Sequence, residues 1–431
     1  MAGAVHFHVA SPALQKKFEA VSFPENLRLF RLLFFVENRK ILREMSENKT
    51  VAVKLNNNSH EYKIKIGHGL LQTCGEWARN CLSEKTARIV IVSNAKIFRL
   101  YGETVQKSLE KADFEVFVFL MKDGERHKNL RSFENLLKFI GENKLARTDA
   151  VVALGGGVVG DLAGFASAVF LRGIDFLQIP TTLLAMIDSS VGGKTGVNSD
   201  FGKNLVGAFH QPNGVLIDTE TLKTLPKREL VAGFCEAVKH GAISNRRLFD
   251  QTAGFLENYP PKNFRKNFSD DEFLAKLANL LASQVTFKAA IVMNDEREAA
   301  DRTDAKSRKI LNFGHTLGHA LEKVTDYKYF KHGEAVGYGI LFASELSKTL
   351  EILDENELKL LNDVFQNVGR LPETKNIEIE KIVQAFSFDK KNIGQTLQWI
   401  LLKRIGEPVI LSNKEISQKS LKESLKKILQ K

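Results

Sequence analysis

Hydrophobic and polar residues alternate in the first clearly patterned segment of the chain. Val51, Val53 and Leu55 alternate with smaller or polar residues. After an asparagine-rich turn at 56–59, the segment 62–66 alternates Tyr and Ile with Lys. A period of two residues on both sides of a polar turn predicts a β-hairpin.

Short apolar runs and helical stretches then follow one another. The runs have the length of strands and lie at 89–92, 116–120 and 150–154, and helical stretches cover 98–111 and 133–143. Strands that alternate with helices predict a mostly parallel sheet covered by helices, in an α/β arrangement.

The pattern changes near residue 225. Strands nearly disappear, and long segments with a helical period follow at 229–242, 271–292, 316–324, 335–350 and 355–367. We therefore predict an α/β domain at 46–224, followed by a mainly α-helical domain at 225–431.

The first 45 residues differ from the rest. Their apolar block comes late and is interrupted by Arg28 and Arg31, which is not the order of a secretory signal. We predict an extension without a fold of its own. A chain start assigned too early is the alternative, because Met45 directly precedes the first patterned segment.

Composition places the chain among ordinary globular proteins. Hydrophobic residues make up 43% and charged residues 26%, which excludes collagen-like and low-complexity chains. No apolar run approaches the ~20 residues that a membrane-spanning helix needs. Three cysteines (Cys74, Cys81 and Cys235) in a chain of this length exclude a disulfide scaffold. None of them forms a CxxC pair, which also excludes a four-cysteine zinc site. This usage fits a reducing compartment, and we expect a cytoplasmic protein.

The net charge of +11 comes mostly from the two ends of the chain. Residues 1–49 hold eight basic and five acidic residues, and residues 413–431 hold six lysines and two glutamates. No stripe of basic and aromatic residues indicates a nucleic-acid groove. We expect a small anionic substrate, and neither a nucleic acid nor a membrane as partner.

A glycine-rich loop follows the apolar run at 150–154. Residues 155–161 read Gly-Gly-Gly-Val-Val-Gly-Asp, and their glycines match G-x-G-x-x-G between a strand and a helix. Such glycines let the backbone approach a pyrophosphate at a helix N-terminus, which predicts a Rossmann-like dinucleotide site. The alternative is a tight turn that needs positive φ angles. Because earlier strands precede this loop, Asn94 and the segment 123–128 could also reach the cofactor.

The segment 178–198 gathers polar groups that are costly to bury without a ligand. It holds Thr181, Thr182, Asp188 and Lys194, and Lys203-Asn204 follow shortly. Two lysines and an asparagine favour an anion cradle. A solvated loop is the alternative, against which the interspersed apolar residues count. Arg172 is a further candidate for the anion, or else forms a surface ion pair.

Histidines and a glutamate suggest a metal site. His315 and His319 are four residues apart, which places both imidazoles on one face of a helix, and His332 and Glu236 are further candidates. Three histidines and a carboxylate suit a catalytic zinc with an open position, and spacing alone favours His315 and His319 as the pair. Helix histidines satisfied by core partners or solvent are the alternative.

Six motifs, in order from about Val51 to Ile410, carry a resemblance. They read GGGVVGDLAGFAS, FLRGIDFLQIPTTLLAMIDSSVGGKTGVN, GKNLVGAFHQP, AGFCEAVKHG, RKILNFGHTLGHALE and HGEAVGYG. Together they resemble the 3-dehydroquinate synthases, the NAD- and zinc-dependent cyclases of the shikimate pathway, which leads to chorismate and the aromatic amino acids. Residues 1–45 lie outside the resemblance.

The resemblance implies a role for each matching residue. The metal ligands would be Glu236, His315 and His332, with His319 contacting substrate instead. The substrate contacts would be Arg172, Asp188, Lys194, Lys203, Asn204, Lys239, Lys288, Arg308, Asn312, His319 and one of Lys390 and Lys391, and the catalytic groups would be Lys194, Asn204, Glu236, Lys239 and His319. NAD would contact Asn94, Glu125, Lys128, Gly156, Gly157, Val158, Asp161, Thr181, Thr182 and Thr224. The sequence departs from the family at Asn94, where Asp is frequent, and in a longer stretch at 299–307.

The resemblance also implies a reaction. The substrate would be 3-deoxy-D-arabino-heptulosonate 7-phosphate, converted to 3-dehydroquinate and phosphate by transient oxidation, elimination, re-reduction, ring opening and an intramolecular aldol step, with NAD restored and zinc or cobalt as metal. The family is commonly homodimeric.

Three other functions compete with this interpretation. A sister sugar-phosphate cyclase would use a substrate without the carboxylate and tends to change the positions of Arg308, Asn312 and His319, all of which are intact here. A metal-dependent polyol dehydrogenase would consume NAD. A non-catalytic descendant would have lost at least one of these positions.

Overall fold

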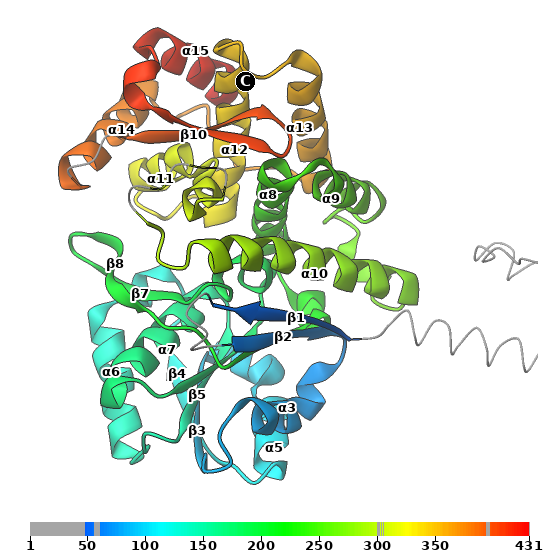
Figure 1. Ribbon diagram of the computed structural model, residues 1–431, viewed down its shortest axis with the longest axis vertical. Coiled ribbons are helices and arrows are strands. Elements are labelled where there is room, and N and C mark those ends of the chain that lie inside the picture. Colours follow the sequence, from blue (N-terminus) through cyan, green and yellow to red (C-terminus); the bar gives the residue numbers. More distant parts are fainter. Residues whose placement is uncertain are drawn as a thin grey trace, which may run out of the picture. The chain divides into compact units, whose positions relative to one another are not determined.

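A seven-stranded sheet forms the centre of the first half of the chain in the computed structural model (Figure 1). The structure describes residues 48–55, 61–299, 302, 304, 306–393 and 397–430, except the side chains of 387–393. The predicted extension at 1–45 and the turn at 56–59 lie outside these residues.

The strand order of this sheet is β1-β2-β9-β6-β5-β3-β4. β1 pairs with β2 in antiparallel fashion, which confirms the predicted hairpin, and the other pairings are parallel. The strands are β1 (Lys49–Lys54), β2 (Glu61–Gly67), β3 (Arg88–Asn94), β4 (Glu115–Met121), β5 (Ala150–Gly155), β6 (Asp175–Pro180) and β9 (Gly214–Asp218).

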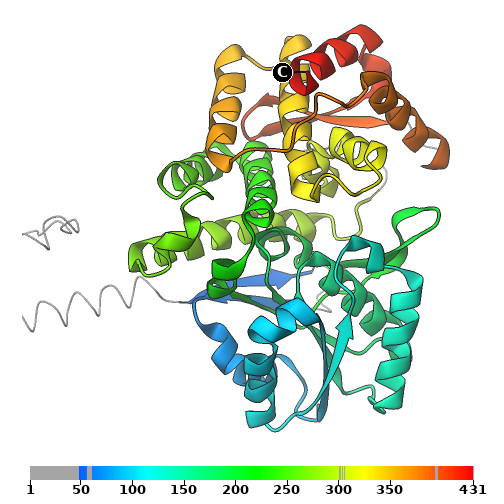
Figure 2. The same ribbon diagram turned by 180° about the vertical axis from the view of Figure 1, so that it is seen from behind.

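The central strands are mostly apolar because helices cover both faces of the sheet. In β3, Ile89 and Ile91 join a core with α3 (Cys74–Cys81) and α5 (Glu103–Lys111). Val90 and Val92 point the other way, into a core with α6 (Leu130–Glu142) and α7 (Gly157–Val169). The two helix pairs lie on opposite faces of the sheet (Figure 1, Figure 2). Each fully buried Val or Ile side chain contributes about 1.5–3 kcal/mol relative to an exposed one.

The second half is mostly helical, as predicted, and its helices share a core with β1, β2 and β9. The described part also holds a two-stranded hairpin of β10 (Gln398–Arg404) and β11 (Glu407–Ser412). The helices are α8 (Lys227–Ser244), α9 (Arg246–Asn258), α10 (Asp271–Asn294), α11 (His315–Val324), α12 (His332–Thr349), α13 (Glu355–Val368), α14 (Ile379–Ile393) and α15 (Gln418–Leu429).

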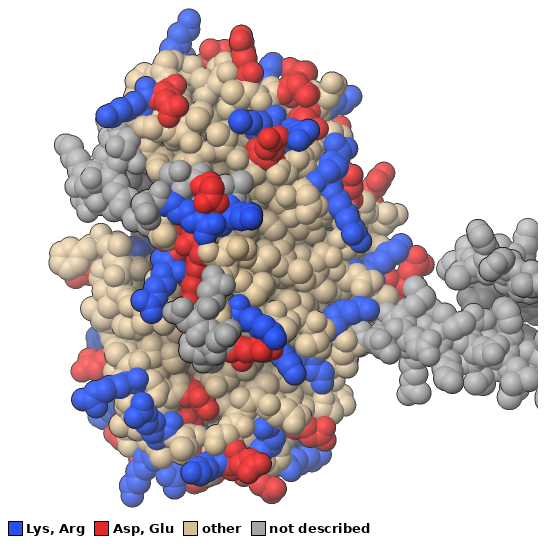
Figure 3. Space-filling view, viewed as in Figure 1, with Lys and Arg blue, Asp and Glu red and all other residues tan. Residues whose placement is uncertain are grey.

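The predicted boundary at 225 falls between β9 and α8, and as a domain boundary it stays a prediction. None of the helices in the described part of the chain is long and apolar enough to cross a membrane. Acidic and basic side chains are mixed over the face that Figure 3 shows.

A second hairpin, which the sequence did not predict, lies outside the seven-stranded sheet. It consists of β7 (Lys194–Ser199) and β8 (Gly202–Phe209), paired in antiparallel fashion. Val197 is buried against α7, whereas Phe201 and Leu205 are exposed. This hairpin carries Lys194, Lys203 and Asn204, and Figure 1 shows its turn extending beyond the neighbouring helices.

Candidate functional site

The predicted cofactor residues gather at the carboxyl edge of the parallel sheet. The chain leaves β3 toward β4 on one side and leaves β5 toward β6 on the other, so the order of strands reverses between β3 and β5. Ligands of open α/β sheets bind at such a reversal. The predicted residues follow β3 (Asn94), β4 (Glu125, Lys128), β5 (Gly156, Gly157, Val158, Asp161), β6 (Thr181, Thr182) and β9 (Thr224).

The glycine loop is shaped by close packing and not by positive φ angles. Gly156 is the N-cap of α7 at φ −80°, so the tight-turn alternative is wrong. A Cβ on Gly157 would lie 2.9 Å from Ser189 Oγ. The N–H groups of Gly157 and Val158 open α7 and have no carbonyl one turn before them within the helix. Thr181 Oγ1 is buried without a partner among the described residues. A helix N-terminus with a buried hydroxyl beside it fits the phosphates of NAD.

Asn94 and Lys128 are already engaged by neighbours. Asn94 caps a short helix by accepting a hydrogen bond from Ile97 N at 2.9 Å. Lys128 is 4% exposed, and its Nζ donates to Asp161 Oδ2 at 2.8 Å and to Asn204 Oδ1 at 2.6 Å. Burial acts to lower the pKa of Lys128, but Asp161 and other acidic neighbours raise it on balance, so the ammonium stays charged. Lys128 therefore joins the predicted cofactor residues to a predicted substrate residue.

A cavity of about 540 Å³ brings the predicted substrate and metal residues together. The predicted residues that line it are Asp161, Asp188, Lys194, Asn204, Lys239, Lys288, Arg308, Asn312, His315, His319 and His332. This arrangement contradicts the solvated-loop alternative for 178–198, most of which is buried or half-buried.

Cations outnumber carboxylates in this cavity. Lys288 Nζ donates to Asp188 Oδ1 at 2.5 Å. Burial acts to raise the pKa of Asp188, but Lys288 and Lys239 hold it well below its usual range. Burial also lowers the pKa of Lys288 to about 8 against the attraction of Asp188. With Lys194 and Arg308 also lining it, the cavity suits an anionic ligand.

Two of the predicted substrate contacts, Arg172 and Lys203, do not line the cavity, and a third cannot be placed among the described side chains. Arg172 is exposed beyond the C-terminal end of α7, whose 13 residues at about 1.5 Å each separate it from the glycine loop. Lys203 pairs with Glu322 instead of lining the cavity. Lys390 and Lys391 lie in α14, and their side chains fall outside the described residues.

Two residues near the cavity were missed in the sequence. Glu298 forms an ion pair with Lys194 and accepts a hydrogen bond from Asn312 Nδ2 at 3.3 Å. His240 is fully buried, with Nδ1 3.0 Å from Gln284 Oε1 and Nε2 3.5 Å from an Asp188 oxygen. Nothing in the sequence distinguishes Glu298 from a solvated loop residue, but a histidine inside an apolar helix beside Lys239 was a usable signal.

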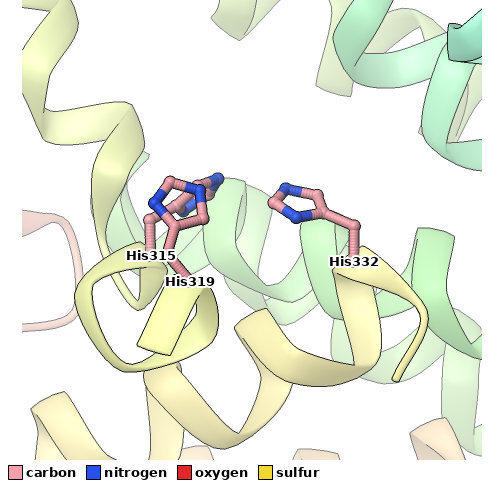
Figure 4. A group of neighbouring side chains, drawn as sticks. All are labelled: His315, His319 and His332. Carbon is pink, nitrogen blue, oxygen red and sulfur yellow. The ribbon is translucent and has the colours of Figure 1, made fainter. Parts of the chain in front are cut away.

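Three imidazoles and a buried carboxylate converge at one wall of the cavity. The possible ligand atoms of His315, His319 and His332 lie within 4.8 Å of one another, and Figure 4 shows their rings facing a common space. Glu236 is fully buried, and its Oε1 lies 4.0 Å from His315 Nε2 and 3.7 Å from His332 Nε2. Neither Glu236 oxygen accepts a hydrogen bond of normal geometry from a described residue, although Lys239 Nζ is 2.5 Å from Oε2.

The hydrogen bonds of His315 and His332, and the lowered pKa of His315, suit a metal ion. His315 Nδ1 lies 3.3 Å from the Phe313 carbonyl, to which it can only donate, so the lone pair of the neutral ring is on Nε2. Burial, together with the charge of Lys239, holds the pKa of His315 well below its usual range. His332 Nδ1 faces Glu322 in the same way, at 3.1 Å. Two Nε2 atoms and an unsatisfied carboxylate oxygen therefore point at one place, which fits zinc or cobalt.

Close helix packing brings these ligands together from distant parts of the sequence. Glu236 lies on α8, His315 begins α11 and His332 begins α12. A Cβ on Gly339 of α12 would overlap the backbone of Gly314, the residue before His315. α11 and α12 therefore touch backbone to backbone.

Comparison with known proteins identifies the family. The family description "3-dehydroquinate synthase N-terminal" matches residues 118–232, and "3-dehydroquinate synthase C-terminal" matches residues 233–392. The chain belongs to the 3-dehydroquinate synthase family. It is 39% identical to the 3-dehydroquinate synthase of Streptococcus pneumoniae (strain 70585) over 351 residues, which cover 81% of this chain and 94% of that protein. The enzyme of Nostoc sp. is 38% identical over 382 residues, covering 88% and 100%.

Solved structures of related cyclases share the fold of this family member. The 2-epi-5-epi-valiolone synthase of Streptomyces hygroscopicus subsp. jinggangensis, solved with NAD⁺ and Zn²⁺ bound, is 25% identical with a TM-score of 0.74, covering 85% of this chain and 96% of that chain. A 2-deoxy-scyllo-inosose synthase gives a TM-score of 0.71 at 23% identity, covering 88% and 100%. The predicted sheet-then-helix architecture is thus confirmed.

Proposed function

We propose that this member of the 3-dehydroquinate synthase family converts 3-deoxy-D-arabino-heptulosonate 7-phosphate into 3-dehydroquinate and phosphate. The single observation that carries the proposal is the shared cavity. It is lined by three histidines that lie close enough to hold a metal, with Glu236 behind them, and by lysines and an arginine that suit a phosphate and a carboxylate. The carboxyl edge of the sheet, with its glycine loop, completes a site for NAD.

The cofactors would supply the chemistry that side chains lack. Bound NAD⁺ supplies a hydride acceptor that returns the hydride within the same cycle, and a bound divalent metal supplies a Lewis acid for a substrate oxygen. The relative solved with NAD⁺ and Zn²⁺ supports both cofactors for this chain. Glu236, His315 and His332 would hold the metal, and cobalt suits the same ligands.

The residues of the chain would bind, orient and neutralise the substrate. Lys194, Lys288 and Arg308 offset the charges of its phosphate and carboxylate. Asn204, whose Oδ1 accepts a hydrogen bond from Lys128 Nζ, also lines the cavity and would contribute to substrate binding. His319 lines the cavity beside the metal set and would hold a proton close to the reacting ring.

Two rival functions make different demands on this cavity. A sister cyclase has a substrate without the carboxylate and no use for the combination of Arg308, Asn312 and His319, all of which line the cavity here. A polyol dehydrogenase would consume NAD⁺ stoichiometrically and needs fewer anion-binding lysines. The likeness to a glycerol dehydrogenase of Schizosaccharomyces pombe, at 15% identity and a TM-score of 0.59, concerns the fold alone.

The decisive experiment measures phosphate release from 3-deoxy-D-arabino-heptulosonate 7-phosphate with catalytic NAD⁺ and added zinc, while absorbance reports NADH. Many phosphates released per NAD⁺ without build-up of NADH is the expected result. Steady NADH accumulation would favour the dehydrogenase. No release from protein loaded with zinc and NAD⁺ would favour a sister cyclase, and uncarboxylated sugar phosphates would be tested next.

We also propose that the enzyme acts as a homodimer in the cytoplasm. Arg172 matches a substrate contact but lies far from the cavity of its own chain, beside exposed Val169 and Leu171. A second copy could supply it. If so, mixing the impaired Arg172→Ala and Lys194→Ala proteins would raise activity to about a quarter of the wild-type value, because half of randomly mixed dimers are hybrids with one intact site. No restoration from subunits shown to exchange would contradict a shared site, and light scattering reports the oligomeric state itself.

A further inference from the structure

One buried carboxylate lies between the candidate metal ligands and the β7–β8 hairpin, which carries predicted substrate contacts. Glu322 is on α11 and is 3% exposed. Its Oε2 lies 3.1 Å from His332 Nδ1, and its Oε1 accepts a hydrogen bond from Lys203 Nζ at 3.1 Å. A buried carboxylate is costly unless its oxygens are paired, and here each oxygen has a partner.

The contact with His332 decides how that imidazole faces the metal site. An ionised carboxylate only accepts hydrogen bonds, so Nδ1 must carry a proton, and in the neutral ring that a metal requires Nε2 then keeps the lone pair. The same contact fixes the ring plane and aims Nε2 at Glu236 Oε1, 3.7 Å away. Without Glu322, the ring could rotate about its side-chain bonds or carry its proton on the other nitrogen, and either change removes a ligand.

The contact with Lys203 ties the β7–β8 hairpin to α11. Lys203 is on β8, and its ammonium also lies over the Tyr327 ring, 4.2 Å from the centroid. Its positive charge offsets the carboxylate that serves His332. The hairpin that carries Lys194 and Asn204 is thereby attached to the helix that carries His315 and His319.

We propose that Glu322 is a positioning residue that holds His332 Nδ1–H, aims Nε2 at the metal, and anchors the substrate hairpin through Lys203. The proposal rests on the metal site of the proposed function. Glu322 would touch neither metal nor substrate and would act through His332 and Lys203.

The test measures metal affinity in the metal-free, full-length protein. Co²⁺ is titrated by its visible absorption, and Zn²⁺ by competition with a chromophoric chelator. Glu322→Ala is expected to weaken binding by about 10- to 100-fold, as loss of a carboxylate behind a histidine ligand generally does. Glu322→Gln is expected to fall between Ala and wild type, because its carbonyl oxygen can still accept the Nδ1–H bond. This graded order is not expected from a merely structural role.

Two further variants distinguish the contact of Glu322 with His332 from its contact with Lys203. Lys203→Met is expected to raise the KM for the sugar phosphate while changing metal affinity by less than about threefold, because Glu322 still accepts from His332. Glu345→Gln is the matched control, because Glu345 is also a buried carboxylate paired with a lysine, Lys427 at 2.7 Å, on the same helix as His332. Its metal affinity should equal that of wild type.

Each outcome has a definite meaning. Tight metal binding by wild type with the same affinity in Glu322→Ala would overturn the proposal and leave the proposed function intact. A wild-type protein that binds neither ion would overturn the metal site and this proposal together. If Glu322→Ala does not fold, Glu322→Gln decides, and an affinity equal to that of wild type with an unchanged Co²⁺ spectrum would overturn it.

Discussion

The contact between α11 and α12 offers a direct way to move metal ligands without touching them. A Cβ placed on Gly339 would overlap the Gly314 carbonyl oxygen and lie 2.6 Å from its carbonyl carbon, whereas ordinary contacts begin at 3.4 Å. The contact with the carbonyl carbon alone would require the two helices to part by about 0.8 Å, and the closer contact with the oxygen requires a larger movement. Metal–ligand distances tolerate only about 0.2 Å. Gly339→Ala should therefore displace His315 from the position that the metal requires.

The magnitude follows from the cost of overpacking. Inserting a methyl group into a packed interface typically costs about 1–3 kcal/mol. If α11 and α12 relieve that strain by moving apart, metal binding must bring them back to their original separation. The binding free energy of the metal is then weakened by the same amount. An affinity loss of roughly 5- to 150-fold follows, since 1.4 kcal/mol is tenfold. The metal-free protein would unfold at nearly the same temperature, because the strain is relieved there.

The assay is Zn²⁺ competition with a chelator, alongside thermal unfolding of the metal-free and loaded proteins. Gly254→Ala is the matched control, because a Cβ at this position in α9 meets nothing within 4 Å. It should stabilise the fold by about 0.4–1 kcal/mol and leave metal affinity unchanged. Wild-type affinity and stability in Gly339→Ala would refute the idea that backbone contact sets the ligand positions.

Three further predictions concern charge and coordination. Lys194→Ala and Arg308→Ala should each lower kcat/KM for the sugar phosphate by roughly 10- to 100-fold and leave the NAD⁺ dissociation constant within about twofold, because a hydrogen bond to a charged group is worth ~1.5–3 kcal/mol. Equal loss of NAD⁺ binding would contradict that assignment. His315→Ala should lose stoichiometric zinc by elemental analysis, and a variant that keeps its zinc would show another ligand set. Lys288, whose pKa is lowered to about 8 by burial, should lose its proton as pH rises through 8, so KM should increase from pH 7 to 9. In Lys288→Arg the positive charge persists at pH 9, so the increase in KM should vanish. An unchanged increase in KM would show that another group causes it.

The parallel sheet and the helical half could be predicted because periodicity is a local property. The runs at 89–92, 116–120 and 150–154 became β3, β4 and β5 with small changes at their ends. The β7–β8 hairpin could not be recognised, because its segment is rich in glycine and polar residues and lacks alternating apolar positions. Its stability comes from neighbours such as α7 and Lys128, which no local pattern reveals.

The candidate metal site shows where local spacing stops being informative. Spacing alone selected His315 and His319, which share a helix face. Glu236, 79 positions before His315, comes near only because α8, α11 and α12 pack together. The resemblance to a family supplied that long-range information. Glu298 and Glu322 were predicted by neither route, because acidic residues on loops and helices are mostly solvated.

Because of the β7–β8 hairpin, we expect the protein to lose substrate binding on warming before it unfolds as a whole. A two-stranded hairpin is only marginally stable by itself. This one lies outside the main sheet and is held by the packing of Val197, Val206 and Ala208 and by hydrogen bonds to Lys128 and Glu322. Its amides should exchange through local opening, at a lower free energy than those of β3 and β5. On warming, the hairpin that binds the sugar phosphate would then open before the parallel sheet that binds NAD⁺ unfolds. Heat inactivation would precede the calorimetric transition, and cooling would restore activity from molecules that never unfolded as a whole.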